Sequence, residues 1–227
     1  MKIGILGTGG VGQALGSGFV RLGHEVRMGS RDANSEKART WVAKAGSGAS
    51  AGTFADAARF AEVDVLATLG TGTERALELA GPDDFAGKVV IDATNPLDFS
   101  SGTPKLFVGH SDSLGEQVQR WLPKAKVVKA FNTVGRDHMV HPKFPGGAPD
   151  MFICGNAAEA KKTVTGFLTA FGWNTIDIGG IEGARILEPL GLLWVTYATR
   201  TNSRNHAFKL LRKENDLATD GSAENLK

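Results

Sequence analysis

Several residue types are scarce in this 227-residue sequence, and each scarcity narrows what the protein can be. Cys154 is the only cysteine, so no intrachain disulfide is possible, which is compatible with a reducing cytoplasm. Aromatic residues make up 7% of the chain, and its formal net charge of +2 comes without a basic stripe, so nucleic-acid binding is not expected. The longest apolar stretch is too short to span a bilayer, and the N-terminus lacks a signal-peptide pattern. These absences favour a cytoplasmic globular protein with neither nucleic-acid nor membrane partners.

Glycine is abundant, with 30 residues, and short apolar segments alternate with helical patterns. Strands are expected at residues 3–6, 25–28, 63–69, 88–93, 126–131, 151–154 and 175–178, with a short further strand within 46–53. Helices are expected at 11–22, 35–45, 55–61, 73–80, 113–121 and 157–171. Such alternation is typical of an α/β fold with helices on both faces of the sheet. We therefore expect a Rossmann-type doubly wound, mainly parallel sheet.

The pattern changes near residue 181, after which only helical spacing remains. Apolar residues recur every three or four positions between 187 and 198, and a second short helix is expected at 203–212. The residues after Glu214 are polar, which is typical of a frayed tail. The sequence thus predicts a nucleotide-binding domain at 1–180 and a short helical C-terminal extension at 181–227.

A glycine-rich segment follows the first expected strand and opens the first expected helix: Gly7, Thr8, Gly9, Gly10, Val11 and Gly12. In this context the G-x-G-x-x-G pattern indicates a dinucleotide-binding turn. Gly7 would form the tight turn, Gly9 would let the backbone approach a pyrophosphate, and Gly12 would let helix and strand pack closely. The helix N-terminus would then present free N–H groups to the phosphates.

The end of the second strand indicates which dinucleotide is bound. NAD-binding versions of this motif usually place an acidic residue there, but here Gly29, Ser30 and Arg31 occupy the position. Gly29 would leave room for a 2′-phosphate, while Ser30 and Arg31 would bind it. Asp32 lies beyond the strand end and is expected to open the next turn. The sequence therefore favours NADP(H) over NAD(H).

Turn-forming residues follow the later strands, where ligands of open parallel sheets bind. The residues expected to contact the nicotinamide half are Thr71, Asn95 and Pro96. The residues expected to contact a second substrate are Asn132, Thr133 and Val134. Ordinary turn chemistry explains the same residues about equally well, because Asn-Pro and Thr-Gly are common in turns.

No set of residues indicates acid–base, nucleophilic or metal catalysis. His138 and His141 lie in the expected loop at 132–150, but two histidines without a third ligand are weak evidence for a metal. Cys154 lies within an expected strand, where it is expected to be a buried small apolar residue. We therefore expect neither a catalytic side chain nor a metal site.

These motifs together resemble the coenzyme F420-dependent NADP oxidoreductase family, in a wider group that includes the pyrroline-5-carboxylate reductases. The matching segments are 7–12, 29–31, Lys129 to Thr133, Ile153 to Asn156 and Glu188 to Tyr197. The resemblance implies a Rossmann domain with a helical extension that closes the active site and forms a homodimer. It also implies direct hydride transfer between NADP(H) and the deazaflavin F420, for which alignment of two rings suffices.

The second substrate stays open at this stage, since a flavin or another small conjugated acceptor also fits. A non-catalytic NADP(H) sensor that binds partner proteins is a second hypothesis. A third is a small imine or pyrroline reductase, although the chain is short for the longer helical domain of those enzymes.

Overall fold

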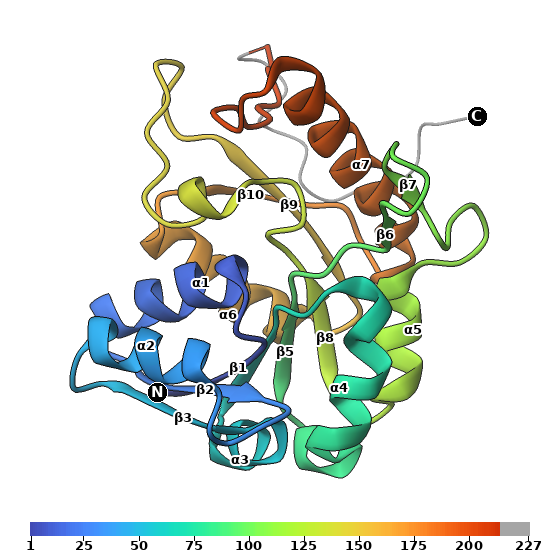
Figure 1. Cartoon of the computed structure of the whole chain (residues 1–227). Coiled ribbons are helices and arrows are strands. Elements are labelled where there is room, and N and C mark those ends of the chain that lie inside the picture. The colour runs from blue at the N-terminus through green and yellow to red at the C-terminus, as the bar shows by residue number, and fades with distance from the viewer. Residues whose placement is uncertain (214–227) are drawn as a thin grey trace.

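Eight strands form the central sheet of the computed structural model, which describes residues 1–213 (Figure 1). Their order is β10-β9-β8-β5-β4-β1-β2-β3, and every neighbouring pair is parallel except β8 and β9. The expected mainly parallel doubly wound sheet is thus confirmed. The strands are β1 (Lys2–Leu6), β2 (Glu25–Ser30), β3 (Ala49–Thr53), β4 (Val63–Leu66), β5 (Val89–Asp92), β8 (Lys126–Lys129), β9 (Asp150–Gly155) and β10 (Asn174–Asp177).

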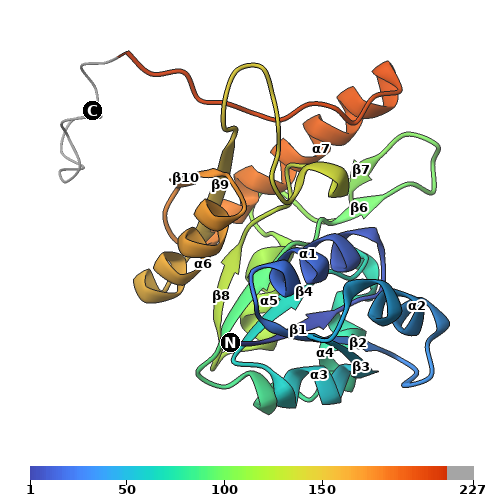
Figure 2. The same ribbon diagram turned by 90° about the vertical axis from the view of Figure 1, so that its left-hand side faces the viewer.

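Helices cover both faces of the sheet (Figures 1 and 2). The helices are α1 (Gly10–Arg21), α2 (Glu36–Ala45), α3 (Phe54–Phe60), α4 (Thr73–Ala80), α5 (Leu114–Trp121), α6 (Ala158–Ala170) and α7 (Ala184–Thr201). Short 3₁₀ turns lie at Gly70–Gly72, Pro82–Phe85, Arg136–His138 and Ile181–Gly183. No helix within residues 1–213 has the length and apolarity needed to cross a membrane.

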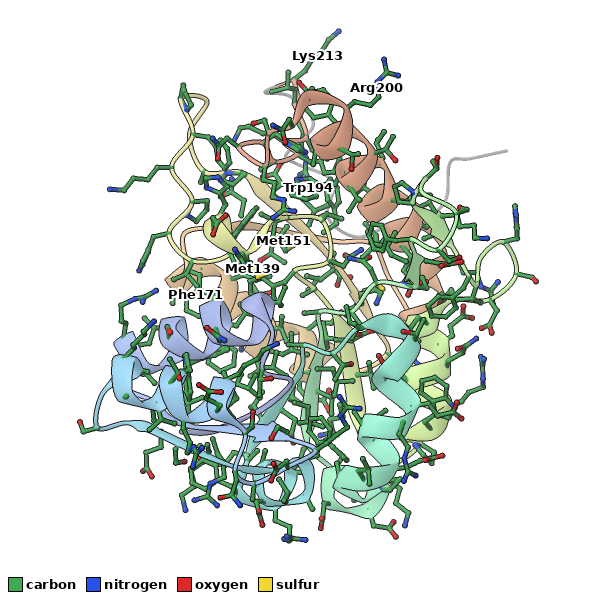
Figure 3. The ribbon with its side chains drawn as sticks, in the orientation of Figure 1. Met139, Met151, Phe171, Trp194, Arg200 and Lys213 are labelled. Atoms are coloured by element: carbon green, nitrogen blue, oxygen red, sulfur yellow. The ribbon has the colours of Figure 1, made fainter. Side chains whose placement is uncertain are left out.

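The core has two parts because alternate residues of each strand point to opposite faces of the sheet. Ile3 and Ile5 of β1 pack with residues of α1, α2 and α6, whereas Leu6 packs with residues of α3, α4 and α5. Both faces are therefore apolar, which explains the nearly continuous apolar runs of the strands. Figure 3 shows the side chains that fill the space between the sheet and the helices.

The chain reverses its winding direction beside β1. It runs from β1 to β2 and β3 on one side, and then returns to β4 and β5 on the other. A crevice therefore opens between the carboxyl ends of β1 and β4, where open α/β sheets bind ligands. Helix α7 lies beyond the carboxyl ends of β5 and β8 and packs against α5 (Figure 1).

Two short strands that the sequence does not predict form a separate hairpin next to α7: β6 (Leu97–Asp98) and β7 (Lys105–Leu106). Only two residues of each strand pair, which is too few to give a periodic signal.

The helix expected at 203–212 is wrong. Asn202 adopts a left-handed conformation with φ of 48° and ends α7, a role that suits asparagine. The following residues extend back along the protein: the Asp150 N–H donates to the Phe208 carbonyl, and the Leu210 N–H donates to the Asp150 carboxylate. These bonds satisfy backbone groups that a helix would have paired internally. The expected polar tail after Glu214 lies outside the described residues.

The expected division at residue 180 stays a prediction. Ala184 and Leu187 of α7 belong to the same apolar cluster as Leu114 of α5 and Ile181, so α7 shares the core on that side of the sheet. The part of the extension that lies within the described residues therefore packs as a continuation of the α/β body.

Candidate functional site

The first of two clefts, with a volume of about 750 Å³, lies at the switch point between β1 and β4. Its walls come from the turns after β1, β2 and β4 and from the first turns of α2 and α4. Among the residues expected to bind the dinucleotide, those that line this cleft are Gly7, Thr8, Gly9, Gly10, Val11, Ser30, Arg31 and Thr71. The expected contacts Gly12, Asn95 and Pro96 are not on its wall.

The glycines of the turn have different physical reasons to be glycine. Gly7 has φ of +128°, and a Cβ there would collide with the Ala67 carbonyl. A Cβ on Gly12 would collide with the Gly7 carbonyl oxygen, so helix and strand approach too closely for a side chain. Gly9 differs, because a Cβ there would have no heavy atom within 4 Å. Packing among the described residues thus does not require glycine at position 9, and the space above it is open to a ligand.

The N-terminus of α1 faces this open space. Gly9 is the N-cap residue, and no side chain among residues 1–213 caps the helix there. The first N–H groups of the helix are therefore available to an anion, and the helix dipole adds partial positive charge.

At the other end of the cleft, Arg31 is exposed and makes no salt bridge within the described residues. The Ser30 hydroxyl donates to the Asp32 carbonyl. Asp32 itself accepts from the Asn34 N–H at 2.8 Å and opens the turn before α2, whose N-cap is Ser35. The expectation that Asp32 opens the next turn is confirmed.

The interpretation of Gly29 as room for a phosphate stays a prediction, and packing gives a second reason for glycine at this position. A Cβ on Gly29 would point toward α3, 2.9 Å from the Ala57 Cβ and 3.0 Å from the Thr53 carbonyl oxygen. Packing of β2 against α3 therefore requires glycine at this position.

Two further cations line the cleft that the sequence reasoning missed. Lys37 comes from the first turn of α2, and Arg75 comes from α4, where it pairs with Glu78 at 2.7 Å. With Arg31 they give three cations, against Asp32 as the one acidic residue of this lining. A signal for Lys37 was present, because it follows Arg31 closely at the start of the next expected helix. The electrostatics of the cleft thus favour an anionic ligand.

A second cleft, with a volume of about 770 Å³, adjoins the first at α1. The clefts share Gly10 and Val11, and the remaining lining residues are Phe99, Val134, Gly135, Arg136, Trp194, Val195, Ala198, Thr199, Asn202 and Arg204. Val134 is thus the one residue among the three expected acceptor contacts that faces a cleft.

Trp194 forms a fixed wall of the second cleft (Figure 3). Its indole N–H donates to the His206 carbonyl at 3.0 Å, and the His206 ring stacks on it with centroids 4.5 Å apart. Gly135 lies against the edge of the indole, because a Cβ there would be 2.9 Å from Trp194 Cη2. The extended segment after α7 therefore holds this aromatic side chain in place.

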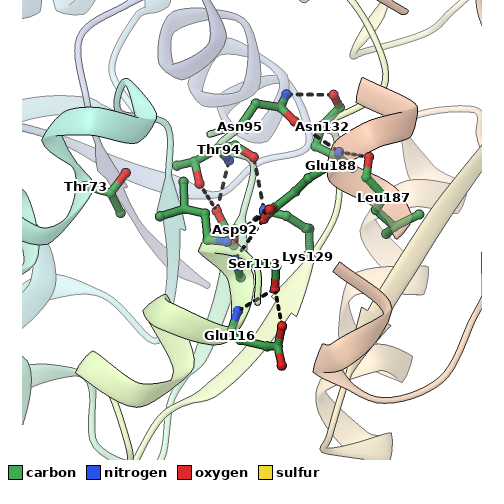
Figure 4. A network of polar contacts seen from close by, with 12 residues as sticks. Thr73, Asp92, Thr94, Asn95, Ser113, Glu116, Lys129, Asn132, Leu187 and Glu188 are labelled. Atoms are coloured by element: carbon green, nitrogen blue, oxygen red, sulfur yellow. Dashed lines mark hydrogen bonds and ion pairs between the residues drawn. The ribbon is translucent and has the colours of Figure 1, made fainter. Parts of the chain in front are cut away.

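Asn95 and Asn132 bond to one another, and Asn132 also bonds to α7 (Figure 4). The Asn95 amide donates to the Asn132 carbonyl at 2.8 Å, and the Asn132 amide donates to the Leu187 carbonyl at 2.7 Å. Gly191 lies directly above, where a Cβ would be 2.6 Å from Asn95 Oδ1. The two asparagines thus fix α7 on the sheet.

The two other expected contacts in these turns are also away from the cleft linings. Thr133 is 2% exposed, with its hydroxyl 3.9 Å from the Met151 sulfur, and Pro96 is buried. Phe131, which lies between β8 and Asn132, has a positive φ of 64°.

A buried ion triad, which the sequence reasoning did not identify, lies below the asparagine pair (Figure 4). The Lys129 ammonium is 2.7 Å from Asp92 Oδ2 and 3.1 Å from Glu188 Oε1, and none of the three side chains is more than 1% exposed. Burial lowers the pKa of Lys129, but the two carboxylates outweigh it and the net direction is upward. Burial raises the pKa of Glu188 despite the nearby ammonium.

Glu188 also accepts from the first N–H groups of α5. The Leu114 and Gly115 N–H groups donate to its two oxygens at 3.0 and 2.9 Å. The triad therefore joins β5, β8, α5 and α7. A sequence signal existed, since charged residues within apolar strands and helices must find partners when buried.

The structure gives the surroundings of Cys154 and His138, while the expectation that no side chain takes part in catalysis stays a prediction. Burial raises the pKa of Cys154 to about 12, so its thiol stays neutral. His138 bonds to the Asn205 amide oxygen at 3.1 Å. Residues 1–213 contain no group of three or more side chains placed to hold a metal.

The doubly wound sheet, the glycine turn and the cationic cleft define a Rossmann-type dinucleotide-binding protein. Residues 2–96 match the family described as NADP oxidoreductase, coenzyme F420-dependent. The F420-dependent NADP reductase of Methanothermobacter thermautotrophicus is 30% identical over 225 residues, covering 92% of this chain and 94% of that protein.

Two further relatives extend this similarity. Metalloreductase STEAP3 of Rattus norvegicus is 33% identical over 204 residues, and the match covers 85% of this chain but 37% of that longer protein. A crystal structure of a candidate F420-dependent NADP reductase from Arthrobacter sp. FB24 superposes with a TM-score of 0.88 at 40% identity, covering 93% of this chain and 100% of that one. The chain therefore belongs to the F420-dependent NADP reductase family and is an NADP-dependent oxidoreductase.

Proposed function

We propose that this protein transfers a hydride between NADPH in the first cleft and a flavin or the deazaflavin F420 in the second. The observation that carries the proposal is that the two clefts adjoin at Gly10 and Val11. With its pyrophosphate at the start of α1, a bound NADPH could extend its nicotinamide past this junction toward a ring in the second cleft. Family membership supports the same pairing of substrates.

The first cleft fits NADPH in both shape and charge. The open space above Gly9 and the uncapped start of α1 suit a pyrophosphate. Arg31, with Ser30 and Lys37 nearby on the wall, suits a 2′-phosphate on the adenosine ribose. Thr71 lies on the wall formed by the turn after β4. We retain the lining residues as dinucleotide contacts and assign Gly12 to the packing of α1.

The second cleft suits a planar acceptor that reacts without help from a protein acid or base. Its lining includes Trp194 and Phe99 but no Asp, Glu, His, Cys or Lys. NADPH would supply a hydride: its C–H bond would break as a bond to hydrogen forms on the acceptor ring, and solvent would supply the proton that neutralises the reduced ring. The protein then contributes alignment and exclusion of water rather than proton transfer.

Asn95 and Asn132 would act as positioning residues in this scheme. Their bonds hold α7, which carries Trp194, at a fixed height above the sheet. Val134 is the sequence-predicted acceptor contact that we retain, because it lines the second cleft.

The test is to mix the protein with NADPH that carries deuterium at the transferred position and with F420, FMN or riboflavin in turn. We expect loss of NADPH absorbance with at least one acceptor, and deuterium retained on carbon in reduced F420 if F420 is used. A protein that binds NADPH tightly but reduces none of these would instead be the non-catalytic sensor. Turnover of a cyclic imine alone would support the imine reductase alternative.

We also propose that the protein is a homodimer formed through α7. Ile186, Leu193 and Tyr197 are 68%, 56% and 54% exposed, and their spacing places them on one face of the helix. A second copy of the same face would cover this apolar surface. Light scattering after size exclusion should show a dimer that Leu193→Glu dissociates, whereas a monomeric parent protein would contradict the assignment. The expected cytoplasmic location stays a prediction.

A further inference from the structure

The charged side chains that line the second cleft are all of one sign. Arg136 and Arg204 are its charged lining residues, and the remaining polar side chains on the wall are Thr199 and Asn202. A cleft with two guanidinium groups and no carboxylate creates a positive local potential. An acceptor with an anionic substituent is therefore favoured over a neutral one with the same ring.

Arg136 comes from the turn after Val134 and crosses the N-terminus of α1. A Cβ on Gly10 would lie 2.5 Å from both the Cδ and the Nη1 of Arg136, so the side chain rests directly on this glycine. Its side chain is 56% exposed, and its Nε is 3.5 Å from the Asp137 carboxylate. The Arg136 side chain therefore lies beside Gly10, which both clefts share, although Arg136 itself lines only the second cleft.

Arg204 lines the same cleft but comes from the extended segment after α7. Its Cβ lies 3.7 Å from the Cβ position of Gly135, beside the edge of the Trp194 indole. The segment that carries it is held by the bond from Trp194 to the His206 carbonyl, at 3.0 Å. Within the described residues Arg204 forms no salt bridge, so its guanidinium is available to a ligand.

We propose that Arg136 and Arg204 are specificity-determining residues that select an acceptor bearing a phosphate on the side chain of its ring. Guanidinium groups match the oxygens of a phosphate and bond to it more strongly than to a neutral hydroxyl. The aromatic wall would hold the ring, and the two arginines would hold the phosphate. This assignment rests on the proposed hydride transfer but concerns the substituent rather than the ring.

FMN and riboflavin provide the direct test, because they differ only in a phosphate. At saturating NADPH we expect kcat/KM for FMN to exceed that for riboflavin by about tenfold or more, mainly through KM. Arg136→Gln and Arg204→Gln should each reduce this ratio, and the double variant should bring it near one. Added salt should narrow the ratio in the parent protein, since these guanidinium groups are partly exposed.

Arg200→Gln is the matched control. Arg200 lies near the end of α7, is exposed and lines neither cleft (Figure 3). It should leave the FMN to riboflavin ratio as in the parent protein. A ratio that falls equally in this variant would show a general loss of positive charge rather than a built phosphate site, and would overturn the assignment.

Equilibrium binding separates this inference from the proposed reaction. FMN and riboflavin fluorescence can be titrated with the NADP⁺-loaded protein whether or not turnover occurs. Preferential binding of FMN that depends on both arginines supports the inference even if hydride transfer fails. Equal affinity for the two flavins, or binding of neither, overturns it. An Arg136→Gln variant that weakens NADPH binding and leaves the FMN to riboflavin ratio unchanged would assign Arg136 to the dinucleotide instead.

Discussion

Replacing Lys129 with methionine would remove the cation that joins Asp92 and Glu188 and leave two carboxylates in a buried site. The ammonium lies 2.7 and 3.1 Å from their oxygens, and the side chains are 0–1% exposed, so water cannot easily replace it. Methionine has a similar length and is apolar, so the change tests charge more than volume.

The size of the expected loss of stability depends on the hydrogen bonds that each carboxylate keeps after the substitution. Removing one partner of a buried ion pair costs about 3–5 kcal/mol. Glu188 keeps two backbone N–H donors, and Asp92 keeps the Thr94 N–H at 2.9 Å and its hydroxyl at 2.6 Å. These bonds favour the lower end, about 3 kcal/mol of unfolding free energy. For a domain of this size that corresponds to a Tm lower by about 6–12 °C.

The loss of unfolding free energy in Lys129→Met should also depend on pH. The pKa of Glu188 is raised above its usual 4.5 by burial, and Lys129 is the largest opposing influence. Without Lys129 this pKa rises further, so the folded state holds a proton that the unfolded state releases above about pH 4.5. Stability therefore falls as pH rises through this window, and the penalty should be larger near pH 8 than near pH 5.

Urea unfolding followed by circular dichroism at these two pH values measures both effects. Lys126→Met is the control, because Lys126 lies in the same strand, is 39% exposed and pairs with Glu159 at 3.1 Å. Its loss should cost no more than about 1 kcal/mol. Lys129→Met combined with Glu188→Gln should regain part of the stability, since one buried charge is then removed. A Lys129→Met penalty that matches Lys126→Met, or that does not change with pH, would refute the reasoning.

Three further predictions follow from other parts of the structure. Arg31→Ala should weaken NADPH binding by about 10- to 100-fold and NADH binding far less, because a charge-assisted bond to the 2′-phosphate is lost. Titration calorimetry measures both affinities, and equal losses for the two dinucleotides would contradict the NADP assignment. Asp64, whose carboxylate oxygens have no hydrogen-bond partner within residues 1–213, has its pKa raised well above 3.8 by burial. Asp64→Val should therefore stabilise the fold by about 1–3 kcal/mol, and the gain in urea melts should grow as pH rises above about 4; no gain at neutral pH would show that the carboxyl has a partner. Gly191→Ala would place a Cβ 2.6 Å from Asn95 Oδ1 and should lower the free energy of unfolding by about 1–3 kcal/mol. Gly166→Ala on α6, where a Cβ meets nothing within 4 Å, is the control and should be neutral or stabilising. Similar Tm values for the two variants would rule out the close contact.

Much of the sheet could be predicted because its signals are local. The strand of Ile3 and Ile5, the glycine turn and the helix after it combine residue patterns that lie within a few positions of one another. The antiparallel direction of β9 could not be predicted in this way. It depends on the path of the long segment between Phe131 and Asp150, whose residues carry no period.

The candidate site shows the same contrast between local signals and contacts that form only on folding. The dinucleotide wall was largely predictable, because it is built from turns that directly follow strands. Asn95 and Asn132 also follow strands, yet their amides bond to each other and to Leu187. Nothing local distinguishes an asparagine that faces a ligand from one that holds a helix distant in sequence. Apart from Val134 and the shared Gly10 and Val11, the lining of the second cleft was missed for the same reason, since Phe99, Arg136 and Trp194 meet only in the folded chain.

The two clefts are also built from different parts of the sequence. Every residue on the wall of the first cleft falls between Gly7 and Leu79, inside the segment 2–96 that matches the family. Apart from Gly10 and Val11, the wall of the second cleft begins at Phe99 and ends at Arg204. Under the proposed assignment, the family match over residues 2–96 therefore concerns the cleft for NADPH and not the cleft for the acceptor. We expect a chimera that exchanges the later half of the chain to change its acceptor and to keep its preference for NADPH.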